Sequence, residues 1–168
     1  KNPSIGFEFG QQTQLTDIGI IGYAMASSET YRQAISLFFN YASSASGLPI
    51  QVIVFEQEND YWGAIFTAPI THELIFRFYY EEIIGMGLAL APVLTGQPLQ
   101  IESITFTWPK GSQQEFLTNI PIQFQSDKNS TLIKSPLLNQ KLIGSNNRVN
   151  ELCLLHCTQI MRNLGQGG

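Results

Sequence analysis

The fold is decided by the segment THELIFRFYYEEIIGMGLALAPVL, which runs from Thr71 to Leu94. From Phe76 onward apolar residues cover most of the helical circumference, so we predict one long helix over the whole segment. A helix that is apolar all round lies at the centre of its domain or is covered by a partner. Gly85 and Gly87 lie within it and indicate close helix packing, not a phosphate-binding loop.

Segments on both sides of this helix predict a sheet. Five of them have the composition or the alternation of strands: Ile50–Phe55, Tyr61–Thr67, Ile101–Trp108, Ile122–Phe124 and Thr131–Lys134. Polar residues between the first two predict a hairpin. The third places Ile104, Phe106 and Trp108 on one face, as in a half-buried strand. A turn at Asp127–Asn129 separates the last two.

Helices are also predicted near both ends of the chain. The first clear element begins at Thr30, where Thr30-Tyr31-Arg32-Gln33 fits a capping box. Apolar residues then recur at helical spacing until Gly47 and Pro49 end the helix. After a break at Gly144–Asn147, Val149–Leu164 carries a narrow apolar seam that suits a linker or a dimer contact. A short helix is expected at Gln113–Thr118.

These elements predict an α+β fold: a small mixed or antiparallel sheet packed by a long apolar helix and an amphipathic N-terminal helix, with a C-terminal linker helix. The length of 168 residues suits a single domain. We assign residues 1–143 to its body and residues 144–168 to the linker helix. The chain opens without Met and closes in Gly167-Gly168, so we expect a piece of a longer protein.

Charge argues against direct binding of nucleic acid. The formal net charge is −4, and the 9 basic residues form no cluster that could displace phosphate counterions. Charged residues make up only 13% of the chain, against about 25% in a typical globular protein. A surface with so little charge favours a partner that covers part of it, and we expect a homodimer.

Membrane association is not expected. The longest apolar stretch, Ile83–Leu94, is shorter than the roughly 20 residues that a spanning helix needs, and the first residues form no signal peptide. Cys153 and Cys157 lie one helical turn apart and are interpreted as reduced thiols. A cytoplasmic location follows as an expectation.

Metal and cofactor sites are not predicted either. Cys153, His156 and Cys157 form a C-x-x-H-C pattern in which two or three side chains could face one ion. Zinc takes four ligands, however, and the other histidine, His72, is far away in sequence. We favour the interpretation that the small thiols fill a helix seam.

Enzyme activity finds little support in the sequence. His72 and His156 are the available imidazole bases, and neither lies in a catalytic signature. Glu81 and Glu82 are neighbours on the long helix and point roughly 100° apart, so they cannot share a site. We expect both on a solvated face, and we predict no catalytic residue.

Aromatic residues offer the remaining candidate site. Most of them fill the core, but Tyr and Trp keep one polar atom that needs a partner when it is buried. A cavity between the sheet and the long helix, lined by rings with a few polar tips, would be typical of a small-molecule site. We predict four ligand-binding residues: Trp62 on the hairpin, Phe76 and Tyr80 on the long helix, and Trp108 on the third strand.

One stretch near the start of the chain has a family likeness. Asp17-Ile-Gly19-Ile-Ile-Gly22-Tyr23-Ala-Met-Ala-Ser27-Ser28-Glu-Thr30 resembles the opening of the arabinose-binding-like N-terminal domain in a branch of AraC-type transcription regulators. That branch shows Gly-x-x-Gly-Tyr, then Ser-Ser-Pro-Thr, then an amphipathic helix. Phe106-Thr-Trp108-Pro109 and Pro121-Ile-Gln-Phe124 match later parts of the pattern, and the likeness extends from about Ile5 to Leu142. The chain departs from the pattern at Glu29 (Pro in the family), Trp108 (often His) and Ile120 (near a usual Gly).

The resemblance implies that residues 1–143 form an effector-sensing and dimerising domain, with a helix-turn-helix DNA-binding region beyond residue 168. DNA would then be bound only through that region. A pocket of Phe, Ile and Leu with one or two polar tips would suit a fatty-acid-like or aromatic effector. Two alternatives stay open: an assembly module without a ligand, and a small enzyme with an unrecognised site around His72, Glu81 or Glu82. A cavity of at least about 300 Å³ favours the sensor, whereas a solid core favours the assembly module.

Overall fold

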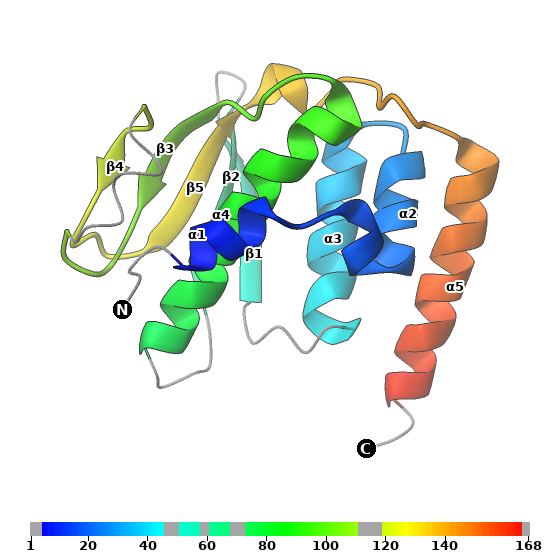
Figure 1. Ribbon diagram of the computed structural model, residues 1–168, viewed down its shortest axis with the longest axis horizontal. Coiled ribbons are helices and arrows are strands. Elements are labelled where there is room, and N and C mark those ends of the chain that lie inside the picture. Colours follow the sequence, from blue (N-terminus) through cyan, green and yellow to red (C-terminus); the bar gives the residue numbers. More distant parts are fainter. Residues whose placement is uncertain (1–4, 46–50, 58–60, 68–72, 111–118, 166–168) are drawn as a thin grey trace.

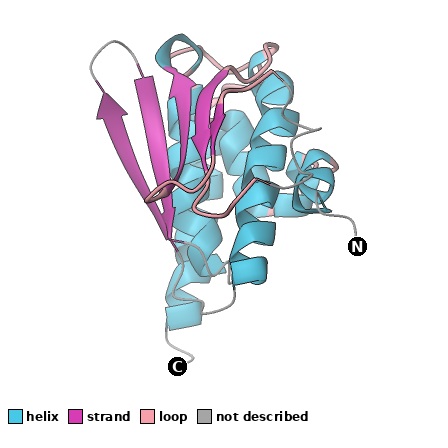
Figure 2. Cartoon of the chain, turned by 90° about the vertical axis from the view of Figure 1, so that its left-hand side faces the viewer, coloured by secondary structure: helices cyan, strands magenta, loops and turns pink. Residues whose placement is uncertain are grey.

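The computed structural model describes residues 5–45, 51–57, 61–67, 73–110 and 119–165. These residues form a mixed α+β fold (Figure 1), which confirms the predicted fold class. A sheet lies on one side and the helices lie on the other (Figure 2). The elements in chain order are α1 (Ile5–Gln11), the 3-10 helix η1 (Leu15–Ile18), α2 (Ile20–Ser27), α3 (Tyr31–Ala45), β1 (Gln51–Gln57), β2 (Tyr61–Thr67), α4 (Glu73–Thr95), β3 (Ile101–Thr105), β4 (Ile122–Gln123), β5 (Asn129–Lys134), the 3-10 helix η3 (Ser135–Leu137) and α5 (Asn147–Gly165).

The long helix α4 lies at the centre of the molecule, between the sheet and α1 (Figure 1). Its sheet side buries Tyr80, whose ring packs on Phe66 of β2 with centroids 4.5 Å apart. The helix ends at Thr95, and Gly96, which follows it, has a φ of +75°. A residue with a side chain rarely adopts that conformation, so glycine suits this position. The predicted helix is confirmed, although its expected first residues Thr71 and His72 lie outside the described residues.

The sheet has the strand order β1-β2-β5-β3-β4. Every neighbouring pair is antiparallel except β3 and β4, which are parallel, and the predicted hairpin is confirmed by the β1–β2 pairing. The third strand ends at Thr105, earlier than the expected Trp108. Beyond it the backbone amide of Thr107 donates to the side-chain oxygen of Asn129 over 2.8 Å, so on the β5 side a side-chain bond takes the place of a backbone bond. Asn129 itself belongs to β5, not to the preceding turn.

Two short helices precede Thr30, where the sequence indicated no clear element. In α1, Gly6 and Gly10 face the middle of α4. A Cβ atom at Gly10 would collide with the backbone carbonyl oxygen of Glu82, so glycine permits the two helices to touch. Gly85 of α4 contacts the backbone of α1 in the same way, which confirms the predicted close packing around this glycine.

The helix predicted from Thr30 is confirmed as α3. The Thr30 hydroxyl accepts a hydrogen bond from the amide of Gln33 over 3.3 Å. The Gln33 side chain accepts one from the amide of Glu29 over 2.9 Å, one residue earlier than an ideal capping box. Gly47 and Pro49, expected to end this helix, and the short helix expected at Gln113–Thr118 lie outside the described residues.

The C-terminal helix α5 is not set apart from the body, because it packs on α2 (Figure 1). The side-chain amide of Asn150 donates to the Ala24 carbonyl oxygen over 2.7 Å, and Cys153 and Cys157 are buried. The predicted seam is divided, because Cys153 is buried against the body whereas Val149 and Leu152 are exposed. The division into a body and a linker helix stays a prediction.

Candidate ligand-binding site

Three of the four predicted ligand-binding residues come together between α4 and the sheet. The ring centroid of Phe76 lies 6.2 Å from that of Tyr80 and 6.4 Å from that of Trp108, and the last two are 6.1 Å apart. Tyr80 is 0% exposed and Trp108 is 2% exposed. Trp62 lies on β2 opposite Ile133, and its side chain is outside the described part of the structure.

The polar tip of Tyr80 already has a partner. Its hydroxyl shares a hydrogen bond of 3.1 Å with the Thr131 hydroxyl. Burial raises the pKa of Tyr80 far above its usual value, so the phenol stays neutral. The rings of Phe66 and Phe106 pack against it at 4.5 and 5.6 Å. These rings fill the space between α4 and the sheet, and ligand binding by the four predicted residues stays a prediction.

Beside this cluster, Glu81 is 2% exposed, so the expected solvated face is wrong for this residue. α1 covers it because Gly6 has no side chain; a Cβ there would lie 2.7 Å from the Glu81 Cβ. Glu81 Oε1 accepts a hydrogen bond from Arg77 Nε over 3.0 Å. Arg77 in turn lies over the Trp108 ring, with Cζ 5.3 Å from the centroid. Burial raises the pKa of Glu81 to about 7, although the Arg77 pair acts in the opposite direction.

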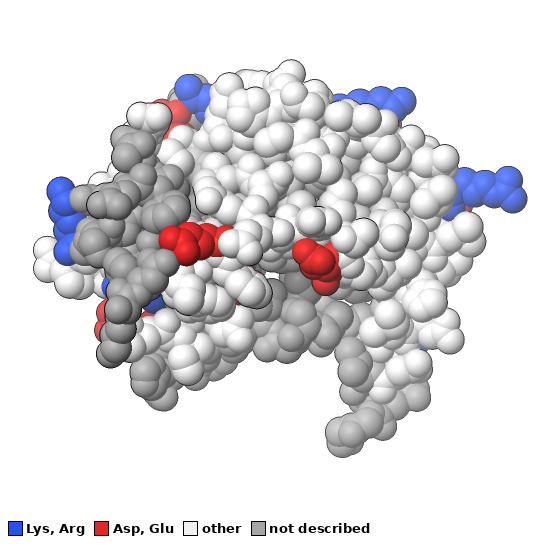
Figure 3. Space-filling view, in the orientation of Figure 1, with Lys and Arg blue, Asp and Glu red and all other residues white. Residues whose placement is uncertain are grey.

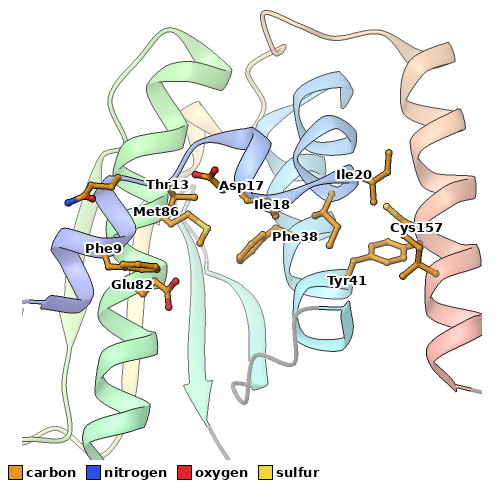
Figure 4. Close-up of a pocket in the computed structure, with 13 residues that line it drawn as sticks. Phe9, Thr13, Asp17, Ile18, Ile20, Phe38, Tyr41, Glu82, Met86 and Cys157 are labelled. Carbon is orange, nitrogen blue, oxygen red and sulfur yellow. The ribbon is translucent and has the colours of Figure 1, made fainter. Parts of the chain in front are cut away.

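A cavity of about 670 Å³ lies on the other side of α4 (Figure 4). Its volume is inside the range of about 300–1,000 Å³ that is typical of small-molecule sites. Its described walls are mainly helical: α1 and α4 lie on one side, η1, α2, α3 and α5 lie around the rest, and Gln12 and Thr13 belong to the segment that joins α1 to η1. The lining residues are Phe9, Gln12, Thr13, Asp17, Ile18, Ile20, Ile21, Phe38, Tyr41, Glu82, Met86, Cys157 and Ile160.

The walls are mainly apolar, and the rim is open to solvent. Ile21, Phe38 and Cys157 are buried, whereas Phe9 and Asp17 are exposed. The 13 described lining residues include two carboxyl groups but no Lys, Arg or His. The molecular face in Figure 3 is likewise mostly uncharged, with acidic groups nearer its middle and basic groups at its margins. The cavity therefore offers apolar contacts and hydrogen-bond acceptors of negative charge.

Glu82 brings to the wall a buried polar atom that has no partner among the described residues. Its Oε2 atom is buried and makes no hydrogen bond to any described residue. Burial raises the pKa of Glu82, because a carboxylate loses hydration there without gaining a counter-ion. Asp17 differs, since its Oδ2 accepts a hydrogen bond from the amide of Gln14 over 2.8 Å. The expectation of a solvated face is thus wrong for Glu82 as well, which is half-buried in the cavity wall.

The helix α5 closes the far side of the cavity with Cys157 and Ile160. Next to them the Thr158 hydroxyl lies 3.4 Å from the Tyr41 hydroxyl of α3 and shares a hydrogen bond with it. Burial and the neighbouring Cys153 raise the pKa of the Cys157 thiol, so it stays protonated. His156 points to solvent, away from the two buried cysteines.

Within the described residues, no group of three His, Cys, Asp or Glu side chains is arranged to hold a metal ion. His72, one of the two candidate bases, lies outside them. No helix in the described ranges has both the length and the apolar character that crossing a membrane requires.

The sequence did not point to the residues that line the cavity. One signal was present: Glu82 and Met86 are four residues apart on α4 and therefore share a helix face, different from the face of Phe76 and Tyr80. The other walls combine α3 and α5, which were predicted, with α1, η1 and α2, where no element was expected. Their convergence on α4 is a tertiary feature that local periodicity does not encode.

Comparison with known proteins identifies a family and a solved structure that resemble this chain. The family model for the arabinose-binding domain of AraC transcription regulator, N-term, matches residues 1–142. The fold is similar to that in the crystal structure of transcriptional regulator CdpR from Pseudomonas aeruginosa, with a TM-score of 0.72 and 16% sequence identity. That likeness covers 97% of this chain but 54% of CdpR, so the chain spans about half the length of that regulator. No curated relative matches the sequence. This chain belongs to the family of arabinose-binding N-terminal domains of AraC-type transcription regulators.

Proposed function

We propose that this domain senses a small effector, bound in the cavity between α4 and helices α1, α2, α3 and α5. The observation that carries the proposal is the cavity itself, with a volume of about 670 Å³, apolar walls and a few polar groups. A molecule with an aliphatic or aromatic body would bury its surface against Phe38, Ile21 and Met86. Membership of a regulator family makes sensing the first candidate for such a cavity.

The two other functions have weaker support. An assembly module without a ligand would gain stability from a filled core, whereas this cavity leaves Glu82 Oε2 without a hydrogen-bond partner among the described residues. An enzyme would place a base beside a nucleophile. In the described part of the cavity wall, the Cys157 thiol is held protonated and its neighbour is the Tyr41 phenol. The family and CdpR are transcription regulators, and we propose that this domain is not an enzyme.

The helix α5 would connect the cavity to the rest of the regulator. It lines the cavity with Cys157 and Ile160, and its last residues lead toward the position where we expect the helix-turn-helix region. An effector that binds one position of α5 better than another would shift the population between them. DNA binding would then respond to the effector through that population shift, and DNA would be contacted by the region beyond residue 168.

A homodimer is part of the proposal. The outer face of α5 exposes Val149, Leu152 and Leu155, which are three residues apart and form one apolar stripe. Leu155→Glu would place a charge on that stripe, and Gln159→Glu, also on an exposed position of α5, is the matched control. Sedimentation at tens of micromolar should show a dimer for the wild type and the control, and a monomer for Leu155→Glu. A monomeric wild type would contradict this part of the proposal.

Filling the cavity tests the sensor function directly. Met86→Trp would occupy part of the space, and Val93→Trp places the same side chain at an exposed position of the same helix. Compounds from a metabolite panel that raise the melting temperature of the wild type should also stabilise Val93→Trp but not Met86→Trp. Native mass spectrometry of the purified chain shows in parallel whether a molecule is retained. Equal stabilisation of all three proteins would place the binding site outside the cavity.

A further inference from the structure

We infer that the molecule bound in this cavity carries a protonated amine, and that the Glu82 carboxylate is its partner. The inference rests on the proposed function, because it names the chemical class of the ligand for the same cavity. The expected effector was fatty-acid-like or aromatic. An apolar body remains consistent with the walls, but the polar end of the molecule follows from the charges that surround it.

The charges of the cavity wall favour a ligand whose polar end is positively charged. Asp17 and Glu82 supply negative charge, and the described wall residues supply no Lys, Arg or His to balance it. A fatty acid would bring a third carboxylate into a cavity whose wall already carries these two. Like charges in a partly buried site repel, and none of the described wall residues is basic and could offset that repulsion. A cation, in contrast, is attracted by both groups.

Glu82 is the specific partner because its hydrogen-bonding capacity is unused. Its Oε2 atom is buried without a hydrogen bond from the described residues. The neighbouring Glu81 is occupied by Arg77, and Asp17 accepts a hydrogen bond from the Gln14 amide. An ammonium group has three donors and would satisfy the buried oxygen while neutralising its charge. Binding would therefore remove an energetic cost that the empty cavity carries.

The surroundings of Glu82 also fit an ammonium group. In Figure 4, Phe9 of α1 lies directly beside Glu82, and Met86 follows one helical turn further along α4. The face of an aromatic ring attracts a cation, and a thioether tolerates an alkyl chain. From this end the wall continues to Phe38 and Tyr41, so an apolar body would extend toward α3. The amine would lie at the α4 end of the cavity.

Three probes that share an eight-carbon alkyl chain and differ in their polar group test the inference: n-octylamine, 1-octanol and octanoate. Isothermal titration of the 168-residue chain at neutral pH should give a dissociation constant for octylamine about tenfold or more below that for octanoate, as expected for a charge-assisted hydrogen bond. Octanol should fall between them. The ranking is measured on the wild type, so it does not depend on a variant that folds.

Substitution of Glu82 then assigns the preference to one residue. Glu82→Gln keeps the shape and removes the charge, and it should reduce the octylamine-to-octanoate preference about tenfold. Glu73→Gln is the matched control, because Glu73 is exposed in the first turn of the same helix and lies outside the cavity. It changes the net charge by the same amount and should keep the wild-type preference. Circular dichroism checks that both variants keep their helix content.

Each other outcome overturns the inference. Octanoate binding more tightly than octylamine would exclude the amine and leave the cavity as an effector site for acids. An unchanged preference in Glu82→Gln would remove Glu82 from the site. If none of the three probes binds the wild type, the amine assignment fails, while the proposed function is still decided by the Met86→Trp and Val93→Trp pair, which does not depend on the ligand's charged end.

Discussion

On the sheet side of α4, Phe76 and Tyr80 pack with Trp108 so that the ring centroids lie within 6.4 Å of one another. On the opposite side of the same helix, Glu82 and Met86 border a cavity of about 670 Å³. Both sides are covered by other elements, yet only the sheet side is filled. The difference teaches that an abundance of aromatic residues marks the packed side, whereas the hollow side is marked by a carboxyl oxygen without a partner among the described residues.

The largest expected effect comes from removing a ring on the filled side. Trp108→Ala should lower the free energy of unfolding by about 3–5 kcal/mol, because a buried indole leaves a cavity behind. Met86→Ala on the hollow side should cost less than about 1 kcal/mol, since its side chain already borders open space. Urea denaturation measures both. Similar losses at the two positions would show that the two sides of α4 do not differ in packing.

The next effect concerns the contact between α1 and α4. Gly10→Ala places a methyl group against the carbonyl oxygen of Glu82 and should destabilise the fold by about 1–3 kcal/mol. Gly87 is the matched control, because a Cβ there meets only the end of the Leu99 side chain at 3.3 Å. Gly87→Ala should be neutral or stabilising, as alanine favours a helix. Thermal unfolding that ranks the two variants in the opposite order would contradict the close packing of α1.

A pH effect is expected from the two neighbouring carboxyl groups of α4, Glu81 and Glu82. The pKa of Glu81 is about 7 in the fold against an ordinary value of 4.5, so the folded state holds the proton more tightly. Its contribution to stability is therefore full below pH 4.5 and is lost as the pH rises toward 7. Allowing for screening, we expect a loss of about 1–2 kcal/mol.

Glu81→Gln should flatten this part of the pH profile of urea denaturation, because the amide does not ionise. Burial raises the pKa of Glu82 too, so Glu82→Gln should remove a further part of the slope. An unchanged profile in Glu81→Gln would mean that this residue is ionised throughout the range.

The smallest effect decides between the two candidate sites. Tyr80→Phe removes the hydrogen bond to Thr131 and should lower stability by about 0.5–1.5 kcal/mol. Thr131→Val removes the other partner and should give a similar loss. If the effector binds in the cavity, its affinity stays unchanged in both variants. If the aromatic cluster is the site, as the sequence predicted, Tyr80→Phe weakens binding by a similar free energy instead.

Among the helices, the sequence predicted those with a long apolar pattern. α4, α3 and α5 repeat their apolar residues over several turns, and the β1–β2 hairpin combines β-branched strands with a polar turn. α1 and α2 were missed because helices of 7 and 8 residues are too short for a periodic signal, and Gly6 and Gly10 weaken what signal there is.

The site was harder to predict than the fold, and Glu81 and Glu82 show why. Carboxyl groups on a helix are usually solvated, and that general rule placed both residues outside. The packing of α1 covers Glu81, and the approach of α3 and α5 turns the surroundings of Glu82 into a cavity wall. Both are packing contacts between segments that lie far apart in the sequence. Phe76, Tyr80 and Trp108, by contrast, were expected near one another and are, because helical spacing and the alternation along residues 104–108 fix their faces.

The attachment of α5 near its first turn gives the helix the geometry of a lever. The side-chain amide of Asn150 donates to the Ala24 carbonyl oxygen, and the backbone amide of Asn146 donates to the Ser27 carbonyl oxygen over 2.9 Å, so a pivot of the helix would lie at that end. With a rise of about 1.5 Å per residue, Cys157 is about 10 Å and Gly165 about 22 Å from Asn150. A rigid helix that pivots there moves about 2 Å at Gly165 for each 1 Å of displacement beside the cavity. The length of α5 beyond the cavity thus sets a mechanical advantage of about two, which grows with every helical residue added after it.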